Sequence, residues 1–388
     1  MSLENKIAKK VRDIPPSGIR KFFDVVSEME GAISLGVGEP DFDTPWHIRE
    51  EGIYSLEQGK TIYSANAGMP NLRKEVSNYM NRKFNLDYEP LTQTLVTVGG
   101  SEGIDIALRT LLEYGEEVLI PEPSFVAYMP CTIFAGGVPI AIDTNEEHNF
   151  KLQPEQLEAA ITPKSKILIL PYPNNPTGAI MTKEDLEKLI PIIKKHDLIV
   201  LSDEIYAELT YGKTHISIAN LEDMYERTVI LSGFSKAYAM TGWRLGYAVG
   251  PEVIISAMTK MHQYVLMCAP TTSQYAGIEA LKNGDNDVLE MRNAYDARRK
   301  IMVNGFRKMG LSCFEPEGAF YVFPSIQKTG LSSVEFCEKL LMEEKVAVVP
   351  GNAFGESGEG FIRCSYAYSI EEIKEALVRI EKFVKKYI

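Results

Sequence analysis

Apolar residues occur along the chain in short continuous runs, most of which do not alternate with polar residues. Runs of this kind are typical of strands buried on both faces of a sheet. Seven such runs lie at residues 94–98, 116–121, 138–143, 166–171, 197–202, 228–232 and 245–250. Helical patterns lie between several of them, as in "TKEDLEKLIPIIKKH", where Thr182 precedes the helix as its predicted N-cap. Because strands alternate with helices, the sequence predicts an α/β fold with a mostly parallel, doubly wound sheet.

The pattern changes after about residue 285. A long charged helical stretch leads to the short apolar segments "GAFYVFPSI", "VAVVPGNAFG" and "GFIRCSYAY", and an amphipathic helical stretch ends the sequence. We predict a large domain over residues 46–285 and a smaller α+β domain formed by residues 1–45 and 286–388. The charged helix is the expected connection.

Composition limits the classes of function. The 388 residues can form one large core and a second, smaller one. A formal net charge of −12 disfavours nonspecific binding of nucleic acid. No apolar run approaches the length that crosses a bilayer, and the N-terminus lacks the apolar core of a signal peptide. We expect a cytoplasmic protein with neither nucleic acid nor membrane as a partner.

The cysteines and histidines suggest no metal. The five cysteines are scattered without a CxxC pair, so we expect reduced thiols. Cys364, beside Arg363, is either an activated thiol or a small buried residue of a strand, and the second interpretation is favoured. The five histidines are also dispersed, and no zinc site is predicted.

Residues with binding chemistry follow five of the predicted strands. In an open parallel sheet, ligands bind beyond the carboxyl ends of the strands. The residues at these places are Gly99-Gly100-Ser101, Ser124-Phe125, Asn174-Asn175-Pro176, Asp203 and Lys236. They offer a glycine turn, an aromatic ring, an amide, a carboxylate and an amine to one surface. Together, although not singly, they predict a ligand site.

Lys236 and Arg244 are the only charged side chains between Thr228 and Pro251. A guanidinium group suits a phosphate, and the free N–H groups of the helix that opens at Gly99 would favour the same anion. A plain strand-to-helix turn, and an arginine paired with a distant carboxylate, are the alternative interpretations.

Asp203 and Lys236 indicate further chemical groups of the same ligand. A carboxylate that ends a buried strand needs a partner, either the N-terminus of the next helix or a cationic ring nitrogen. A lysine is either solvated or, where its pKa is lowered, a nucleophile that forms a Schiff base with an aldehyde. An aldehyde, a phosphate and a ring nitrogen occur together in pyridoxal 5'-phosphate, which we predict as the cofactor.

Six stretches, in the same order and over nearly the whole chain, carry a family resemblance. The chain resembles the class I (class I/II) pyridoxal-phosphate-dependent aminotransferases of fold type I. It is most similar to their bacterial and archaeal branch acting on aromatic amino acids, aspartate and related substrates. This resemblance implies a large domain with a seven-stranded sheet. The matching stretches are "GVGEPDFDTP" (36–45), "YSANAGMPNLR" (63–73), "YPNNPTGA" (172–179), "SDEIY" (202–206), "GFSKAYAMTGWRLGY" (233–247) and "FIRCSYA" (361–367).

The resemblance implies roles around the cofactor ring. Lys236 would be the Schiff-base lysine and later the proton shuttle, and Asp203 would pair with the pyridinium nitrogen. Tyr206 and Asn175 would hydrogen-bond the phenolic oxygen of the ring. Phe125 would stack on the ring, where many relatives carry Trp or Tyr.

The resemblance also implies how the phosphate is held. Backbone N–H groups of Gly100, Ser101 and Glu102 would bind it together with Arg244. Many relatives place a Ser or Thr three residues before the lysine, where this chain has Gly233. Ser232 and Ser235 are the two substitutes, and the sequence leaves the choice open.

Arg363 resembles the arginine that holds the substrate α-carboxylate, beside the Gly38 backbone, and Phe125 and Asn175 are expected to contact the substrate too. Tyr63 resembles a tyrosine that reaches the phosphate of the neighbouring subunit, which implies a homodimer with shared sites. The family also suggests a cis peptide before Pro176.

The predicted reaction moves an amino group between an aromatic or aspartate-like L-amino acid and a 2-oxo acid such as 2-oxoglutarate. An acylated diaminopimelate intermediate is an alternative substrate, and a cystathionine-type C–S β-lyase is an alternative reaction on the same cofactor. The aminotransferase-like half of a regulator would need a DNA-binding domain, which we do not find in the sequence. The residues predicted to line the distal pocket are Ile19, Arg20, Tyr63, Phe125 and Tyr264.

Overall fold

A computed structural model describes residues 3–16 and 29–388. Its largest sheet has seven strands in the order β2-β8-β7-β6-β5-β3-β4. Only β8 runs antiparallel to its neighbours, β2 and β7, so the predicted mostly parallel sheet is confirmed. The strands are β2 (Thr94–Thr97), β3 (Glu117–Glu122), β4 (Val138–Asp143), β5 (Ser165–Leu170), β6 (Ile199–Asp203), β7 (Thr228–Gly233) and β8 (Gly246–Val249).

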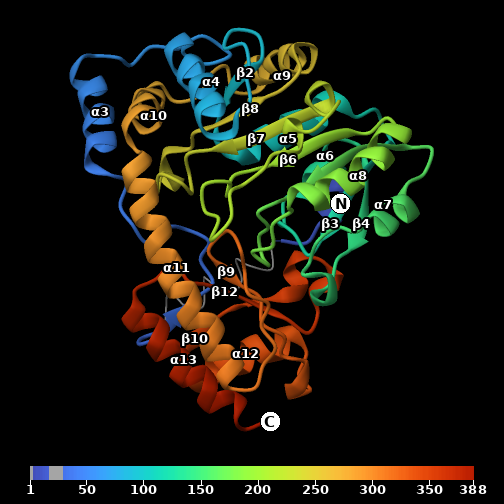
Figure 1. Ribbon diagram of the computed structural model, residues 1–388, viewed down its shortest axis with the longest axis vertical. Helices are drawn as coiled ribbons and strands as arrows, with labels where there is room; N and C mark the ends of the chain where they lie inside the picture. Colours follow the sequence, from blue (N-terminus) through green and yellow to red (C-terminus); the bar gives the residue numbers. More distant parts are fainter. Residues whose placement is uncertain (1–2, 17–28) are drawn as a thin grey trace.

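Helices cover both faces of this sheet (Figure 1). Along β5, Ile167 and Ile169 belong to the core shared with α5 (Gly99–Leu111) and α9 (Glu252–Val265). Leu168 and Leu170 belong to the core shared with α7 (Pro154–Ala160) and α8 (Lys183–Lys195). Strands with two buried faces need apolar residues at every position, which explains the continuous runs. The edge strand β4 differs, because three of its six residues are exposed.

The α-helices of the described residues have these bounds: α1 (Lys9–Arg12), α3 (Trp46–Glu57), α4 (Pro70–Phe84), α5 (Gly99–Leu111), α6 (Tyr128–Phe134), α7 (Pro154–Ala160), α8 (Lys183–Lys195), α9 (Glu252–Val265), α10 (Thr271–Asn283), α11 (Asp285–Lys308), α12 (Ser333–Glu344) and α13 (Ile370–Val384). Thr182 caps α8 as predicted, because its side chain accepts the backbone N–H of Asp185. None of these helices has both the length and the apolar character needed to cross a membrane.

The long helix α11 runs from the level of the large sheet down to a smaller α+β part, where α13 packs beside it (Figure 1). A three-stranded antiparallel sheet in the order β11-β12-β9 forms the centre of this part. A parallel pair of β1 with β10 joins an N-terminal segment to it, whereas α1 lies near α6 of the large part, where Lys10 Nζ donates to Phe134 O at 2.8 Å. The strands are β1 (Ile33–Ser34), β9 (Tyr321–Val322), β10 (Val346–Ala347), β11 (Val349–Pro350) and β12 (Ile362–Ser365).

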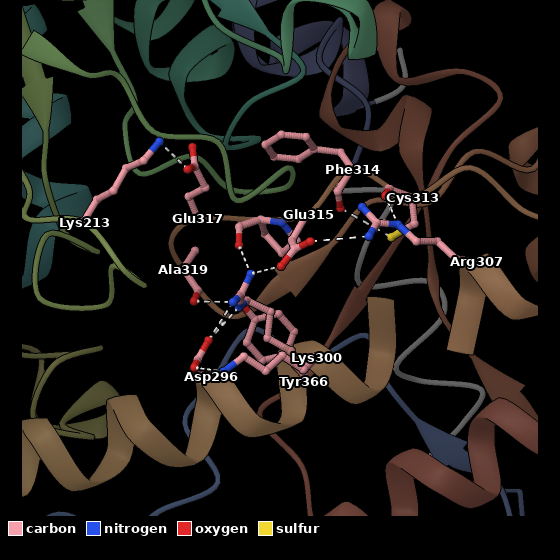
Figure 2. A network of polar contacts seen from close by, with 12 residues as sticks. Lys213, Asp296, Lys300, Arg307, Cys313, Phe314, Glu315, Glu317, Ala319 and Tyr366 are labelled. Carbon is pink, nitrogen blue, oxygen red and sulfur yellow. Dashed lines mark hydrogen bonds and ion pairs between the residues drawn. The ribbon is translucent and has the colours of Figure 1, made fainter. Parts of the chain in front are cut away.

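Ion pairs fix α11 against the segment that leads into β9 (Figure 2). The Arg299 guanidinium donates to Asp296 within α11 at 2.7 Å, to Glu315 at 3.0 Å and to the Pro316 carbonyl at 2.9 Å. Lys213, from the large part of the chain, pairs with Glu317 of the same segment at 2.5 Å. These contacts set the position of β9, which forms one wall of the site described next.

Candidate active site

A cavity of about 310 Å³ lies between the carboxyl ends of the parallel strands and the smaller part of the chain. Among the residues that line it are Gly38, Gly100, Ser101, Phe125, Asn175, Asp203, Tyr206, Ser235, Lys236, Arg244 and Arg363. Of the predicted catalytic, cofactor-binding and carboxylate-binding residues, the structure therefore brings together all except Glu102, Ser232 and Tyr63. The parallel topology explains this convergence, because β3, β5, β6 and β7 all end at the same edge.

Lys236 follows β7 and reaches the wall of the cavity, where its Nζ donates to the Gly38 carbonyl at 2.6 Å. Burial lowers the pKa of this amine to about 8, and the nearby Arg363 and Arg244 also lower it, against the opposing effect of Glu39 and Asp203. A lysine with such a pKa is partly neutral near pH 7 and is a competent nucleophile.

Asp203 is the last residue of β6. Its Oδ2 accepts the Tyr128 hydroxyl at 2.7 Å, and its Oδ1 accepts the Ile205 N–H at 3.2 Å. Burial raises the pKa of this carboxyl, and the two hydrogen bonds oppose the rise. Among the described residues no cation forms an ion pair with Asp203, so the carboxylate is suited to receive a cationic ring nitrogen from a ligand.

The phosphate end of the predicted site is built from two neighbouring strands. β2 pairs with β8, which places Gly99 and Gly100 against Gly246. A Cβ on Gly246 would lie 2.6 Å from the carbonyl carbon of Gly99, and a Cβ on Gly99 would lie 2.6 Å from Nη2 of Arg244. Only glycines allow this approach, which sets the Arg244 guanidinium beside the N-terminus of α5. The arrangement fits a phosphate.

Gly233 pairs with Gly246 across β7 and β8. A Cβ on Gly233 would lie 2.9 Å from the Gly246 Cα, so this backbone has no room for the side chain that many relatives carry there. Ser232 does not line the cavity, and its hydroxyl donates to the Glu204 carbonyl at 3.2 Å. Ser235 does line it. Of the two predicted substitutes, the geometry favours Ser235.

Arg363 lies on β12 and is buried. Its Nη1 donates to Asn175 Oδ1 at 2.9 Å and its Nη2 to the Gly36 carbonyl at 2.6 Å, whereas its Nε has no partner among the described residues. No carboxylate of those residues forms an ion pair with it. A buried cation held only by neutral oxygens is suited to bind the carboxylate of a substrate.

Some predicted residues lie elsewhere. The Glu102 side chain points away from the cavity, because it accepts the Val98 N–H at 2.5 Å and pairs with His262 at 2.5 Å. Tyr63 and Tyr264 are 77% and 81% exposed and do not line the cavity of this single chain. Ile19 and Arg20 fall outside the described residues. The Asn175–Pro176 peptide is cis, as the resemblance suggested.

Tyr128 and Tyr321 are among the cavity residues that were not predicted from the sequence. Tyr128 is the first residue of α6, and its backbone N–H donates to the Phe125 carbonyl at 3.3 Å, so a helix predicted to start after Phe125 would have indicated it. Tyr321 comes from the smaller part of the chain. No local pattern distinguishes it from the other aromatic residues of "GAFYVF".

Glu204, next to Asp203, points to the opposite side of β6, as the alternation of a strand requires. Its buried carboxylate accepts the hydroxyls of Ser202 at 2.7 Å and Ser217 at 2.6 Å, and contacts Nε2 of His215 at 2.8 Å. This cluster fixes the end of β6 and therefore the position of Asp203.

We predict that Glu204→Ala lowers the free energy of unfolding by about 3 kcal/mol, because it leaves buried polar groups without their acceptor. Urea unfolding of the cofactor-free protein measures this change. The control is Glu371→Ala, at an exposed position of α13, which should change stability by less than about 0.5 kcal/mol. Equal stabilities of the two variants would contradict the assigned role of Glu204.

Comparisons with known proteins agree with the geometry. A family model described as aminotransferase class I and II matches residues 30–380. The chain is 55% identical over 376 residues to the putative aminotransferase YugH of Bacillus subtilis, with 97% of both chains covered. It is 46% identical over 383 residues to aromatic-amino-acid aminotransferase 2 of Thermococcus litoralis, with 98% of both chains covered.

Solved structures give the same result for the fold. The aspartate aminotransferase from Thermus thermophilus, determined with maleate, superposes with a TM-score of 0.92. The two chains are 38% identical, and the match covers 97% of this chain and 99% of that one. The chain therefore belongs to the aminotransferase class I and II family, has its fold type I architecture and is, like the members of that family, a pyridoxal-phosphate-dependent aminotransferase.

Proposed function

We propose that this aminotransferase moves the amino group between an aromatic or aspartate-like L-amino acid and a 2-oxo acid such as 2-oxoglutarate, with Lys236, Asp203 and Arg363 as its central residues. The observation that carries the proposal is that one cavity holds a lysine of lowered pKa together with a buried carboxylate and a buried arginine, neither of which forms an ion pair with any of the described residues. These are the groups that a pyridoxal-phosphate enzyme needs for the aldehyde, the ring nitrogen and the substrate carboxylate.

When bound, pyridoxal phosphate supplies an aldehyde that condenses with amines and a protonated ring that accepts electrons from Cα. Asp203 keeps the proton on the ring nitrogen. Lys236 would hold the cofactor through its amine, and the same amine, once free, would move the proton from Cα of the substrate. Positioned acid–base groups of this kind contribute about 10²–10⁴-fold to the rate.

The remaining residues orient the substrate and hold the cofactor. Arg363 binds the α-carboxylate and thereby fixes which bond at Cα lies perpendicular to the ring. Because Asn175 Oδ1 is occupied by Arg363, the Asn175 amide keeps its Nδ2 free to donate to the phenolic oxygen, together with the Tyr206 hydroxyl. Phe125 packs against the ring.

The phosphate is held by Arg244, the Ser235 hydroxyl and the backbone N–H groups at Gly100, Ser101 and Glu102. Although the Glu102 side chain faces away, its carboxylate holds the turn in place by accepting the Val98 N–H. The role of Glu102 in this proposal is therefore confined to the backbone.

The absorbance of the purified protein tests the proposal. We expect a yellow protein that loses its colour on addition of glutamate without an acceptor, and regains it with 2-oxoglutarate. Tyrosine, aspartate and an acylated diaminopimelate would then be compared as donors. Release of ammonia and pyruvate from cystathionine would indicate the lyase instead, which the relatives do not favour. A protein that cannot be loaded with pyridoxal phosphate would contradict the assignment.

We also propose a cytoplasmic homodimer in which Tyr63 contacts the phosphate held by the partner. An exposed apolar surface beside Tyr63 supports the proposed dimer. Thr271 Oγ1 bonds the Ile62 carbonyl and Asn66 Nδ2 bonds the Met267 carbonyl, so two exposed segments lie together. The exposed apolar residues on them are Ile62, Tyr63, Tyr264, Val265, Leu266 and Met267. Such a patch is typical of a protein interface.

We predict a dimer by sedimentation, and a roughly fivefold weaker retention of pyridoxal phosphate in Tyr63→Phe, because one hydrogen bond is lost. Tyr114→Phe, at another exposed tyrosine, is the control and should retain the cofactor normally. A fully active monomer would contradict the shared site.

A further inference from the structure

Tyr321 lines the cavity but has no role in the mechanism above. It lies on β9 and is 1% exposed, although it belongs to the smaller part of the chain. The side chain therefore reaches the site from the wall opposite the parallel strands. A buried tyrosine hydroxyl needs a hydrogen-bond partner, and the identity of that partner indicates its role.

The Tyr321 hydroxyl lies 2.9 Å from the Tyr206 hydroxyl. Either oxygen can be the donor in this structure. Tyr206 has a single hydroxyl proton, and in the proposed function that proton is donated to the phenolic oxygen of the cofactor. The Tyr206 oxygen must then accept a hydrogen bond from the Tyr321 hydroxyl. A hydroxyl that accepts one hydrogen bond donates a stronger one, so Tyr321 would strengthen the bond from Tyr206 to the cofactor.

The ring of Tyr321 contacts the group that binds the substrate. The Arg363 guanidinium lies 4.4 Å from its centroid and 4.7 Å from the ring centroid of Phe354, in the 3-10 turn that follows β11. The Tyr321 hydroxyl also lies against Gly38, where a Cβ would approach it to 2.6 Å. The Gly38 carbonyl in turn accepts a hydrogen bond from the Lys236 amine. One side chain therefore contacts Tyr206, Arg363 and Gly38.

We propose that Tyr321 is a positioning residue with two separable parts: its hydroxyl polarises Tyr206 toward the phenolic oxygen of the cofactor, and its ring orients Arg363 toward the substrate carboxylate. The inference rests on the proposed function, because it assumes that Tyr206 and Arg363 meet those groups.

Two variants separate the parts. Tyr321→Phe removes the hydroxyl and keeps the ring, whereas Tyr321→Leu removes both. The control is Tyr366→Phe, because Tyr366 is buried in the same core and its hydroxyl donates to the Ala319 carbonyl at 3.1 Å without lining the cavity. Each cofactor-loaded variant is titrated from pH 5 to 9 by the visible absorbance of the bound cofactor, and steady-state kcat and KM are measured with glutamate.

For Tyr321→Phe we expect the titration midpoint to rise by about half a pH unit, because the phenolic anion loses part of its stabilisation. We expect kcat to fall about fivefold and KM to change by less than about twofold. For Tyr321→Leu we expect, in addition, a roughly tenfold rise in KM, because Arg363 loses its stacking surface. Tyr366→Phe should match the wild type in all three quantities.

A Tyr321→Phe variant with the midpoint of the wild type would overturn the role of the hydroxyl. A shift of equal size in Tyr366→Phe would show a general loosening of the core and would also overturn it. Unchanged KM in Tyr321→Leu would overturn the role of the ring. In all three outcomes the wild type still binds the cofactor and reacts with glutamate. Failure of the wild type itself would instead contradict the proposed function.

Discussion

Replacing Lys236 with alanine should lower kcat by about 10⁴-fold or more, because the change removes the group that we propose moves the proton at Cα. The same change removes the proposed point of covalent attachment of the cofactor. The variant should still bind pyridoxal phosphate through Arg244, Asp203 and the α5 N-terminus, but its absorbance should resemble that of the free aldehyde. Stopped-flow absorbance with glutamate measures both the binding and the lost proton transfer.

The control for this experiment is Lys374→Ala, at an exposed position of α13 that does not line the cavity. It should leave turnover unchanged. A small primary amine added to the Lys236→Ala variant should restore part of the rate, because it replaces the missing base in the cavity. Substantial activity of Lys236→Ala without added amine would show that another group moves the proton.

Asp203→Asn is the second large effect that we expect. The substitution keeps the shape of the side chain and an oxygen for the Tyr128 hydroxyl, but it removes the negative charge. Without that charge the ring nitrogen loses its proton and the ring accepts electrons from Cα less well. We expect kcat/KM to fall by about 10²–10³-fold, the loss typical for one electrostatic contact in an active site.

Tyr128→Phe separates the charge of Asp203 from its position. It removes the 2.7 Å hydrogen bond to Asp203 and leaves the carboxylate in place. We expect a loss in kcat/KM of about fivefold, corresponding to one hydrogen bond. If Asp203→Asn lost no more activity than Tyr128→Phe, the carboxylate would position the site without supplying charge, and the proposed mechanism would be wrong at this step.

The large sheet was the most predictable part of the molecule. Strands such as β5 are buried on two faces and therefore carry an apolar residue at every position, a pattern visible without any structure. Asp203 and Lys236 were predictable for a related reason. The parallel topology sends the residues that follow β6 and β7 to one edge, so position along the chain alone places them together.

Other features depend on contacts between distant residues. Ser232 and Ser235 are equivalent by sequence, and the close approach of Gly233 to Gly246 decides between them. Tyr321 reaches the cavity because the ion pairs of Arg299 and Lys213 set the position of its segment. The proposed role of Tyr63 would depend on a second copy of the chain. No local pattern encodes any of these three relations.

The most direct test of the central claim is to locate the covalent link to the cofactor. The protein loaded with pyridoxal phosphate is reduced with borohydride, which makes the link stable, and is then digested and mapped by mass spectrometry. We expect the pyridoxyl group on Lys236 alone, and we expect prior incubation with glutamate to prevent the labelling. A label on another lysine, or none on Lys236, would contradict the assignment of the active site.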